Sequence, residues 1–114
     1  MNAERAREVG EPILARFESE AARYGVRLPK LEWAAGRFDH QRDPASGLDA
    51  VCARWNYDGR RVQLTLRPDG HVYGECDLLI DHPTKPGMWM DVLAIWGVPP
   101  ALKCEPSLIE KPAE

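Results

Sequence analysis

The sequence has little of what would mark a catalytic or metal-binding protein. Its 114 residues include three cysteines, Cys52, Cys76 and Cys104, with no C-x-x-C pair among them. This spacing indicates neither a zinc ribbon nor a disulfide framework. The G-x-S-x-G, Walker A, G-x-G-x-x-G and H-E-x-x-H patterns are also absent. We therefore expect no catalytic residue, no cofactor and no resident metal.

Long apolar runs and an excess of positive charge are missing as well. No stretch approaches the roughly 20 apolar residues that span a bilayer, and the charged start MNAERAREVGEP lacks the apolar segment of a signal peptide. The expectation is a cytoplasmic protein without a membrane partner. With a net charge of -3 and a pI near 5.6, the chain also lacks the basic field that nucleic-acid binding requires, so no nucleic-acid partner is expected.

One basic platform remains as an alternative, on a single face of the expected sheet. It would consist of Arg54, Arg61, Arg67 and Tyr73, with the tyrosine available for stacking on bases. Two carboxylates, Glu75 and Asp77, lie in the same patch and cancel much of its charge.

What is present is the composition of a globular protein, 44% apolar and 29% charged, in a chain that fits one domain over residues 1–114. Both ends, about 1–8 and 107–114, are expected to be loosely ordered. An amphipathic helix is predicted first, with Ile13, Leu14, Phe17, Ala21 and Tyr24 on one face and Gly25 just past its end. Residues 3–10 extend this stripe, but Gly10 beside Pro12 predicts a frayed or kinked junction.

The next part of the sequence is hard to interpret. Leu31, Trp33 and Phe38 are apolar anchors that one short strand would explain. The run DHQRDPASG over residues 39–47 has a turn composition and no periodicity, and it predicts an exposed loop.

Two turn signatures follow, Asp58-Gly59 and Pro68-Asp69-Gly70, and each separates alternating apolar runs. A two-residue turn at the first pairs Trp55 with Val62. A three-residue loop at the second, with Gly70 left-handed in a bulge, pairs Val62 with Cys76 and keeps one face apolar. The opposite face then pairs Arg61 with Asp77, as cross-strand stabilisation favours. We predict a three-stranded antiparallel meander.

The segment PGMWMDVLAIWG, residues 86–97, predicts a second helix. Its apolar side chains fill an arc of roughly 160° on a helical wheel, and Met90 lies beyond the edge of that arc. Pro86 fits the first turn, and Gly97 with the following prolines fits the end. A short final strand is expected in ALKCE, residues 101–105. The predicted fold class is α+β: an N-terminal helix, an antiparallel three- to four-stranded meander, a C-terminal helix packed on one sheet face, and a short final strand.

The candidate site residues are few. Asp81, His82 and Lys85 lie where the third strand feeds the predicted second helix, and Asp39 with His40 forms a second Asp-His pair. If the two pairs met in space, two imidazoles and two carboxylates would suit a metal. The alternative is that Asp81 and His82 cap backbone groups of a turn.

The tryptophan and methionine content offers a candidate interface. Met88, Trp89 and Leu93 lie on a stripe that a small sheet would not cover completely, and Met90 lies just beyond its edge; such residues are enriched at interface centres. The alternative is that these side chains are simply core, with Trp55 packed on Trp96. The sequence thus predicts a non-catalytic protein-interaction or accessory module, with a homodimer as one form. The alternative is a small metal- or ligand-binding enzyme-like domain that uses the Asp81-His82 loop.

Overall fold

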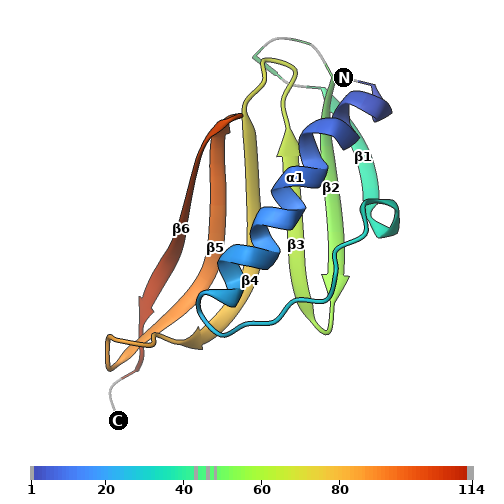
Figure 1. Ribbon diagram of the computed structural model, residues 1–114. Coiled ribbons are helices and arrows are strands. Elements are labelled where there is room, and N and C mark those ends of the chain that lie inside the picture. Colours follow the sequence, from blue (N-terminus) through green and yellow to red (C-terminus); the bar gives the residue numbers. More distant parts are fainter. Residues whose placement is uncertain (1, 43, 46, 48, 113–114) are drawn as a thin grey trace.

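Six antiparallel strands and one long helix make up the part of the chain that the structure describes (Figure 1). This computed structural model describes residues 2–42, 44–45, 47 and 49–112. The strands lie in the sheet in the order of the sequence, as a simple meander. The elements are α1 (Ala3–Ala22), the 3-10 turn η1 (Trp33–Ala35), β1 (Arg37–Arg42), β2 (Asp49–Tyr57), β3 (Arg60–Leu66), β4 (Val72–Asp81), β5 (Met88–Val98) and β6 (Ala101–Glu110).

The helix α1 is capped by Asn2, whose side chain accepts a hydrogen bond from the backbone N–H of Arg5 at 2.8 Å. This bond satisfies one of the free donors of the first turn. The helix continues through Gly10 and Pro12, so it is not interrupted at the junction where the sequence predicts fraying. Its buried residues, which pack on the sheet, are Ala6, Gly10, Ile13, Leu14, Phe17 and Ala21.

The predicted registers of the central strands are confirmed. Trp55 pairs with Val62, and Val62 pairs with Cys76. At the second turn, Gly70 has a φ of 94°, and the backbone N–H of Arg67 donates to the carbonyl of His71 at 2.9 Å, as the bulged three-residue loop requires. Alternation of apolar and polar side chains therefore determined this part of the sheet.

The predicted C-terminal helix is wrong, because residues 88–98 form the strand β5 between β4 and β6. Two bulges explain why the pattern resembled a helix. The register shifts by one residue between Asp77 and Ile80 of β4 and again between Met90 and Leu93 of β5. Each shift inverts the alternation, so Met90 and Leu93 are both fully buried although they are three positions apart in the sequence. An odd spacing of buried residues is also typical of a helix face.

Two further predictions need correction. The final strand is longer than expected and extends over Ala101–Glu110. The edge strand β1 occupies residues 37–42, where the sequence predicts the end of a short strand and the start of an exposed loop. The short strand expected near residues 31–38 is replaced in part by η1. In the loop after β1, residues 43, 46 and 48 lie outside the described residues. Regular structure also extends into both chain ends, since α1 begins at Ala3 and β6 ends at Glu110.

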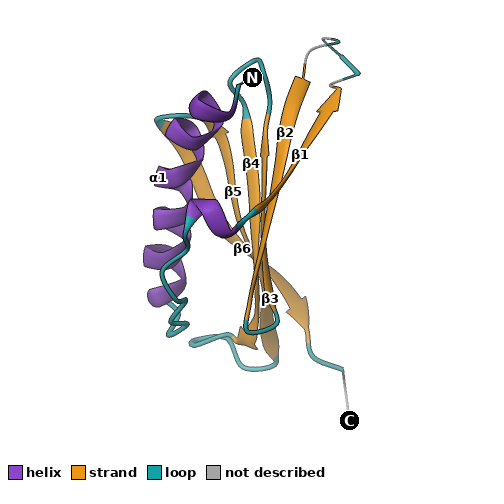
Figure 2. Ribbon diagram, turned by 90° about the vertical axis from the view of Figure 1, so that its right-hand side faces the viewer, coloured by secondary structure: helices purple, strands orange, loops and turns teal. Residues whose placement is uncertain are grey.

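The protein has two layers in its described part, because α1 crosses one face of the sheet and no element covers the other face (Figure 2). The core lies between these layers and includes Phe17, Leu64, Leu66 and Ile95, which are completely buried. In the described residues, no helix has both the length and the apolar character needed to cross a membrane.

Candidate functional site

The predicted loop of Asp81, His82 and Lys85 forms the turn between β4 and β5. The Nδ1 atom of His82 accepts hydrogen bonds from the backbone N–H groups of Thr84 and Lys85, both at 3.1 Å. Asp81 is paired with Lys111 at 2.5 Å. The hydrogen bond from Lys111 lowers the pKa of the Asp81 carboxyl. The side chains of Asp81 and His82 thus stabilise the turn and join it to the end of β6.

The second Asp-His pair lies far from this turn. Asp39 and His40 are on β1, three strands away from β4 in the sheet. Asp39 lies at the same level as Tyr73, and Asp81 is eight residues further along β4, which is roughly 25 Å. The structure therefore does not bring the two pairs together. Among the described residues, no group of three or more metal-ligating side chains could hold an ion.

The candidate interface residues are distributed over both faces of β5. Met90 and Leu93 are completely buried on the side of the sheet that α1 covers, so they are not at the surface of this chain. Met88 and Trp89 are half-buried at the start of the strand. The Lys111 ammonium lies over the Trp89 ring at 5.9 Å from its centroid, within the range of a cation–π contact. Trp96 does not pack on Trp55, which contacts Trp33 and Phe38 instead.

The face of the sheet opposite α1, here called the outer face, has a regular arrangement of side chains. The strand registers align them in rows that run across the sheet from β1 to β6. The first row is Arg37, Arg54, Gln63, Glu75, Ala94 and Glu105. The second row is Asp39, Cys52, Thr65, Tyr73, Trp96 and Lys103. A third, shorter row is Asn56, Arg61, Asp77 and Val92.

Charge on the outer face is divided between its two halves. The arginines of the rows, Arg37, Arg54 and Arg61, all lie on β1 to β3. The glutamates and Asp77 lie on β4 and β6, and the two exceptions are Asp39 on β1 and Lys103 on β6. The outer face is therefore basic on one half and acidic on the other, which extends the local pairing of Arg61 with Asp77 over the whole sheet.

Aromatic side chains lie on the acidic half. Tyr73 is 46% exposed, and its hydroxyl donates a hydrogen bond to the Glu75 carboxylate at 2.5 Å. This bond raises the pKa of Tyr73, because it would be lost on ionisation. Trp96 is the cross-strand neighbour of Tyr73 and is half-buried. Together they form an apolar platform on a face that no other described element covers.

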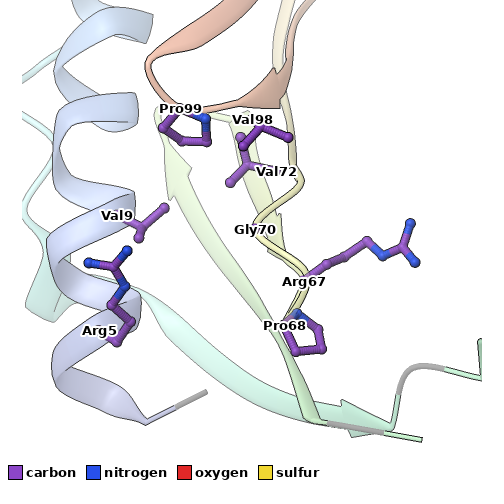
Figure 3. Close-up of a pocket in the computed structure, with 8 residues that line it drawn as sticks. All are labelled: Arg5, Val9, Arg67, Pro68, Gly70, Val72, Val98 and Pro99. Atoms are coloured by element: carbon purple, nitrogen blue, oxygen red, sulfur yellow. The ribbon is translucent and has the colours of Figure 1, made fainter. Parts of the chain in front are cut away.

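The cavity beside the first half of α1 does not resemble an active site. A cavity of about 310 Å³ lies between the first half of α1 and the turns that follow β3 and β5 (Figure 3). Figure 3 shows the Arg67 side chain directed away from it. The eight described residues that line it include no histidine, carboxylate, cysteine or hydroxyl side chain: Arg5, Val9, Arg67, Pro68, Gly70, Val72, Val98 and Pro99. General acid–base or nucleophilic chemistry has no group to use there.

A smaller hollow of about 150 Å³ lies between α1 and β1, and the sequence did not predict it. It is lined by Ala3, Ala6, Trp33, Phe38, His40 and Val51. The rings of Trp33 and Phe38 lie 5.0 Å apart, and both contact Trp55. The sequence signal was the aromatic pair of Trp33, the first residue of η1, and Phe38, which follows η1. The predicted short strand did not place this pair near α1.

Cys76 and Cys104 are not suited to act as nucleophiles. Burial raises the pKa of the Cys76 thiol to about 11 and that of Cys104 to about 11. Thiols with raised pKa values are poor nucleophiles near neutral pH. Comparison with protein-family models, with curated proteins and with solved structures finds no match to this chain.

Proposed function

We propose that this protein is a non-catalytic interaction module that binds another protein surface through the outer face of its sheet. The observation that carries the proposal is the exposure of this face: Tyr73 and Trp96 lie on it between charged rows, and no second layer of the described chain covers them. Aromatic residues surrounded by a polar rim are typical of interface centres. The enzyme-like alternative loses its support, since His82 and Asp81 are engaged in the β4–β5 turn.

A photo-crosslinking experiment tests this proposal. A photoreactive phenylalanine derivative replaces Tyr73 on the outer face in one variant. In the matched control it replaces Phe38, which is 41% exposed against 46% for Tyr73 but lies on the opposite face. Illumination in the native cells should give a covalent adduct with a protein, including this chain itself, at position 73 and not at position 38.

Two results would contradict the proposal. The absence of any protein adduct at position 73 would show that the outer face has no protein partner. Equal adduct yields at positions 73 and 38 would show only unspecific collision. The choice of matched aromatic positions ensures that probe size and exposure do not explain a difference.

A further inference from the structure

We infer that the partner bound by the outer face is a second copy of this chain, packed face to face about a twofold axis that runs parallel to the strands between β3 and β4. The inference rests on the proposed function, because it requires the outer face to be a binding surface. Its basis is that the rows of this face are complementary to themselves about that axis, in charge and in size.

The charge argument follows from the strand order. Rotation about this axis places β3 over β4 of the partner, β2 over its β5 and β1 over its β6. In the third row, Arg61 then faces the partner's Asp77. In the first row, Arg37 faces the partner's Glu105. The two exceptions to the charge division also match, since Asp39 faces the partner's Lys103. Each of these ion pairs occurs twice in the dimer because of the symmetry.

The size argument uses the second row. Thr65 faces the partner's Tyr73, and Cys52 faces the partner's Trp96. Small side chains on β2 and β3 therefore lie opposite the aromatic side chains of Tyr73 and Trp96. Facing layers of a sheet sandwich need this alternation of large and small residues, because the sheets pack about 10 Å apart.

Twofold axes that run along β3, β4 or β5 lack this complementarity. A twofold axis along β3 would place Arg61 against the partner's Arg61. An axis along β4 would bring Glu75 against the partner's Glu75, and an axis along β5 would bring it against the partner's Glu105. Like charges facing each other across an interface are strongly unfavourable. The axis between β3 and β4 avoids all three contacts.

The area of the outer face suits a dimer interface. Six strands at a spacing of about 4.8 Å span about 24 Å, and seven to ten residues extend over roughly 25–30 Å. The projected area is thus about 600–700 Å², close to the ~800 Å² that each partner buries in a standard interface. Twist rotates the facing strands by about 30° relative to each other, so the pairs near the axis, such as Arg61 with the partner's Asp77, are the most closely matched.

The decisive experiment is a charge exchange, followed by light scattering over a concentration series. The wild type should have twice the chain mass of 12.9 kDa. Arg61→Asp makes positions 61 and 77 both acidic, and Asp77→Arg makes positions 61 and 77 both basic. Each change should raise the Kd of the dimer at least about 100-fold. Mixing the two variants should form a heterodimer, because each then faces its opposite charge, and the double variant should recover the homodimer.

A matched control is Arg23→Asp at the end of α1, a charge reversal on an exposed arginine far from the outer face. It should leave the dimer unchanged. Circular dichroism confirms that each variant is folded, and the heterodimer test keeps the result decisive even if a single variant is less stable.

Three results would overturn the inference. These are a wild type that stays monomeric up to about 1 mM, a dimer that neither charge reversal weakens, and two variants that do not combine on mixing. The proposed function is judged separately: a protein adduct at position 73 to a different protein would preserve it while the inference fails, and no adduct at all would remove both.

Discussion

The indole of Trp33 lies directly against the backbone of Gly10 in the middle of α1, so that a Cβ atom at position 10 would overlap its six-membered ring. This contact explains a glycine at a position where helix propensity disfavours it. It also fixes η1 beneath the helix, where Trp33 contacts Trp55 at a centroid distance of 5.4 Å. The close approach therefore connects the first helix to the aromatic cluster beside β1.

Gly10→Ala should destabilise the protein by about 1–3 kcal/mol, because the overlap with Trp33 outweighs the gain in helix propensity. Chemical denaturation measures the free energy of unfolding. The control is the same change in a Trp33→Ala background, where it should stabilise by up to about 1 kcal/mol. Equal effects in the two backgrounds would mean that the Trp33 contact does not determine the glycine.

Leu79 has a φ of 39° at the bulge of β4 and is 62% exposed, so its side chain adopts an unfavourable backbone conformation and gains little burial. Leu79→Gly should therefore stabilise the protein or leave its stability unchanged, since the left-handed conformation costs a leucine about 1–2 kcal/mol. Ile109→Gly is the matched control, because Ile109 is 39% exposed in β6 and has no positive φ. It should destabilise by about 1 kcal/mol. If Leu79→Gly lowered the stability as much as Ile109→Gly does, the strain argument would be contradicted.

Met90 and Trp96 distinguish core from surface on the same strand. Met90→Glu should unfold the protein, because it buries a carboxylate at a position with 0% exposure. Trp96→Glu should leave the fold intact, since Trp96 is half-buried on the outer face beside Lys103, and it should abolish self-association. Thermal unfolding and light scattering separate the two effects. A folded Met90→Glu variant would show that the inward side of β5 is wrongly assigned.

The difference between these two positions shows where sequence reasoning succeeded and where it failed. The registers of Trp55 with Val62 and of Arg61 beside Asp77 followed from turn chemistry and strict alternation. The bulges at Leu79 and Asp91 interrupt alternation, and no local residue pattern signals them. Because the bulge in β5 gives its buried residues an odd spacing, the segment fits a helical stripe, and this interpretation placed Trp96 in the core instead of on the outer face. The turn role of His82 was predictable from its neighbours, whereas the separation of the two Asp-His pairs depends on sheet order.

His82 provides a test of the turn that the sequence singled out. His82→Ala removes the acceptor for the backbone N–H groups of Thr84 and Lys85 and should reduce the free energy of unfolding by about 1 kcal/mol. His82→Asn should retain most of the stability, because an asparagine oxygen caps such turns. Lys85→Ala should change the stability by less than about 0.5 kcal/mol. Loss of stability with asparagine as large as with alanine would contradict the capping role.

Cys76 should make the protein sensitive to alkali. Burial raises the pKa of its thiol from 9.0 to about 11 in the folded state, so the neutral thiol is favoured by folding. In the unfolded chain the Cys76 thiol ionises from about pH 9, whereas in the folded protein it stays neutral until about pH 11. The contribution of Cys76 to the free energy of unfolding is therefore fully present below pH 9 and is lost as the pH rises towards 11. The loss is of the order of 2 kcal/mol.

Denaturation of the wild type and of Cys76→Ala at a series of pH values measures this contribution, because groups common to both proteins cancel in the difference. Between pH 6 and 8 the variant should be less stable by a constant amount, since it leaves a small cavity at a fully buried position. Above pH 9 the gap should narrow, and near pH 11 the variant should equal or exceed the wild type. A gap that stays constant up to pH 11 would show that the Cys76 thiol ionises alike in both states, and its burial between β3 and β5 would then have no electrostatic cost.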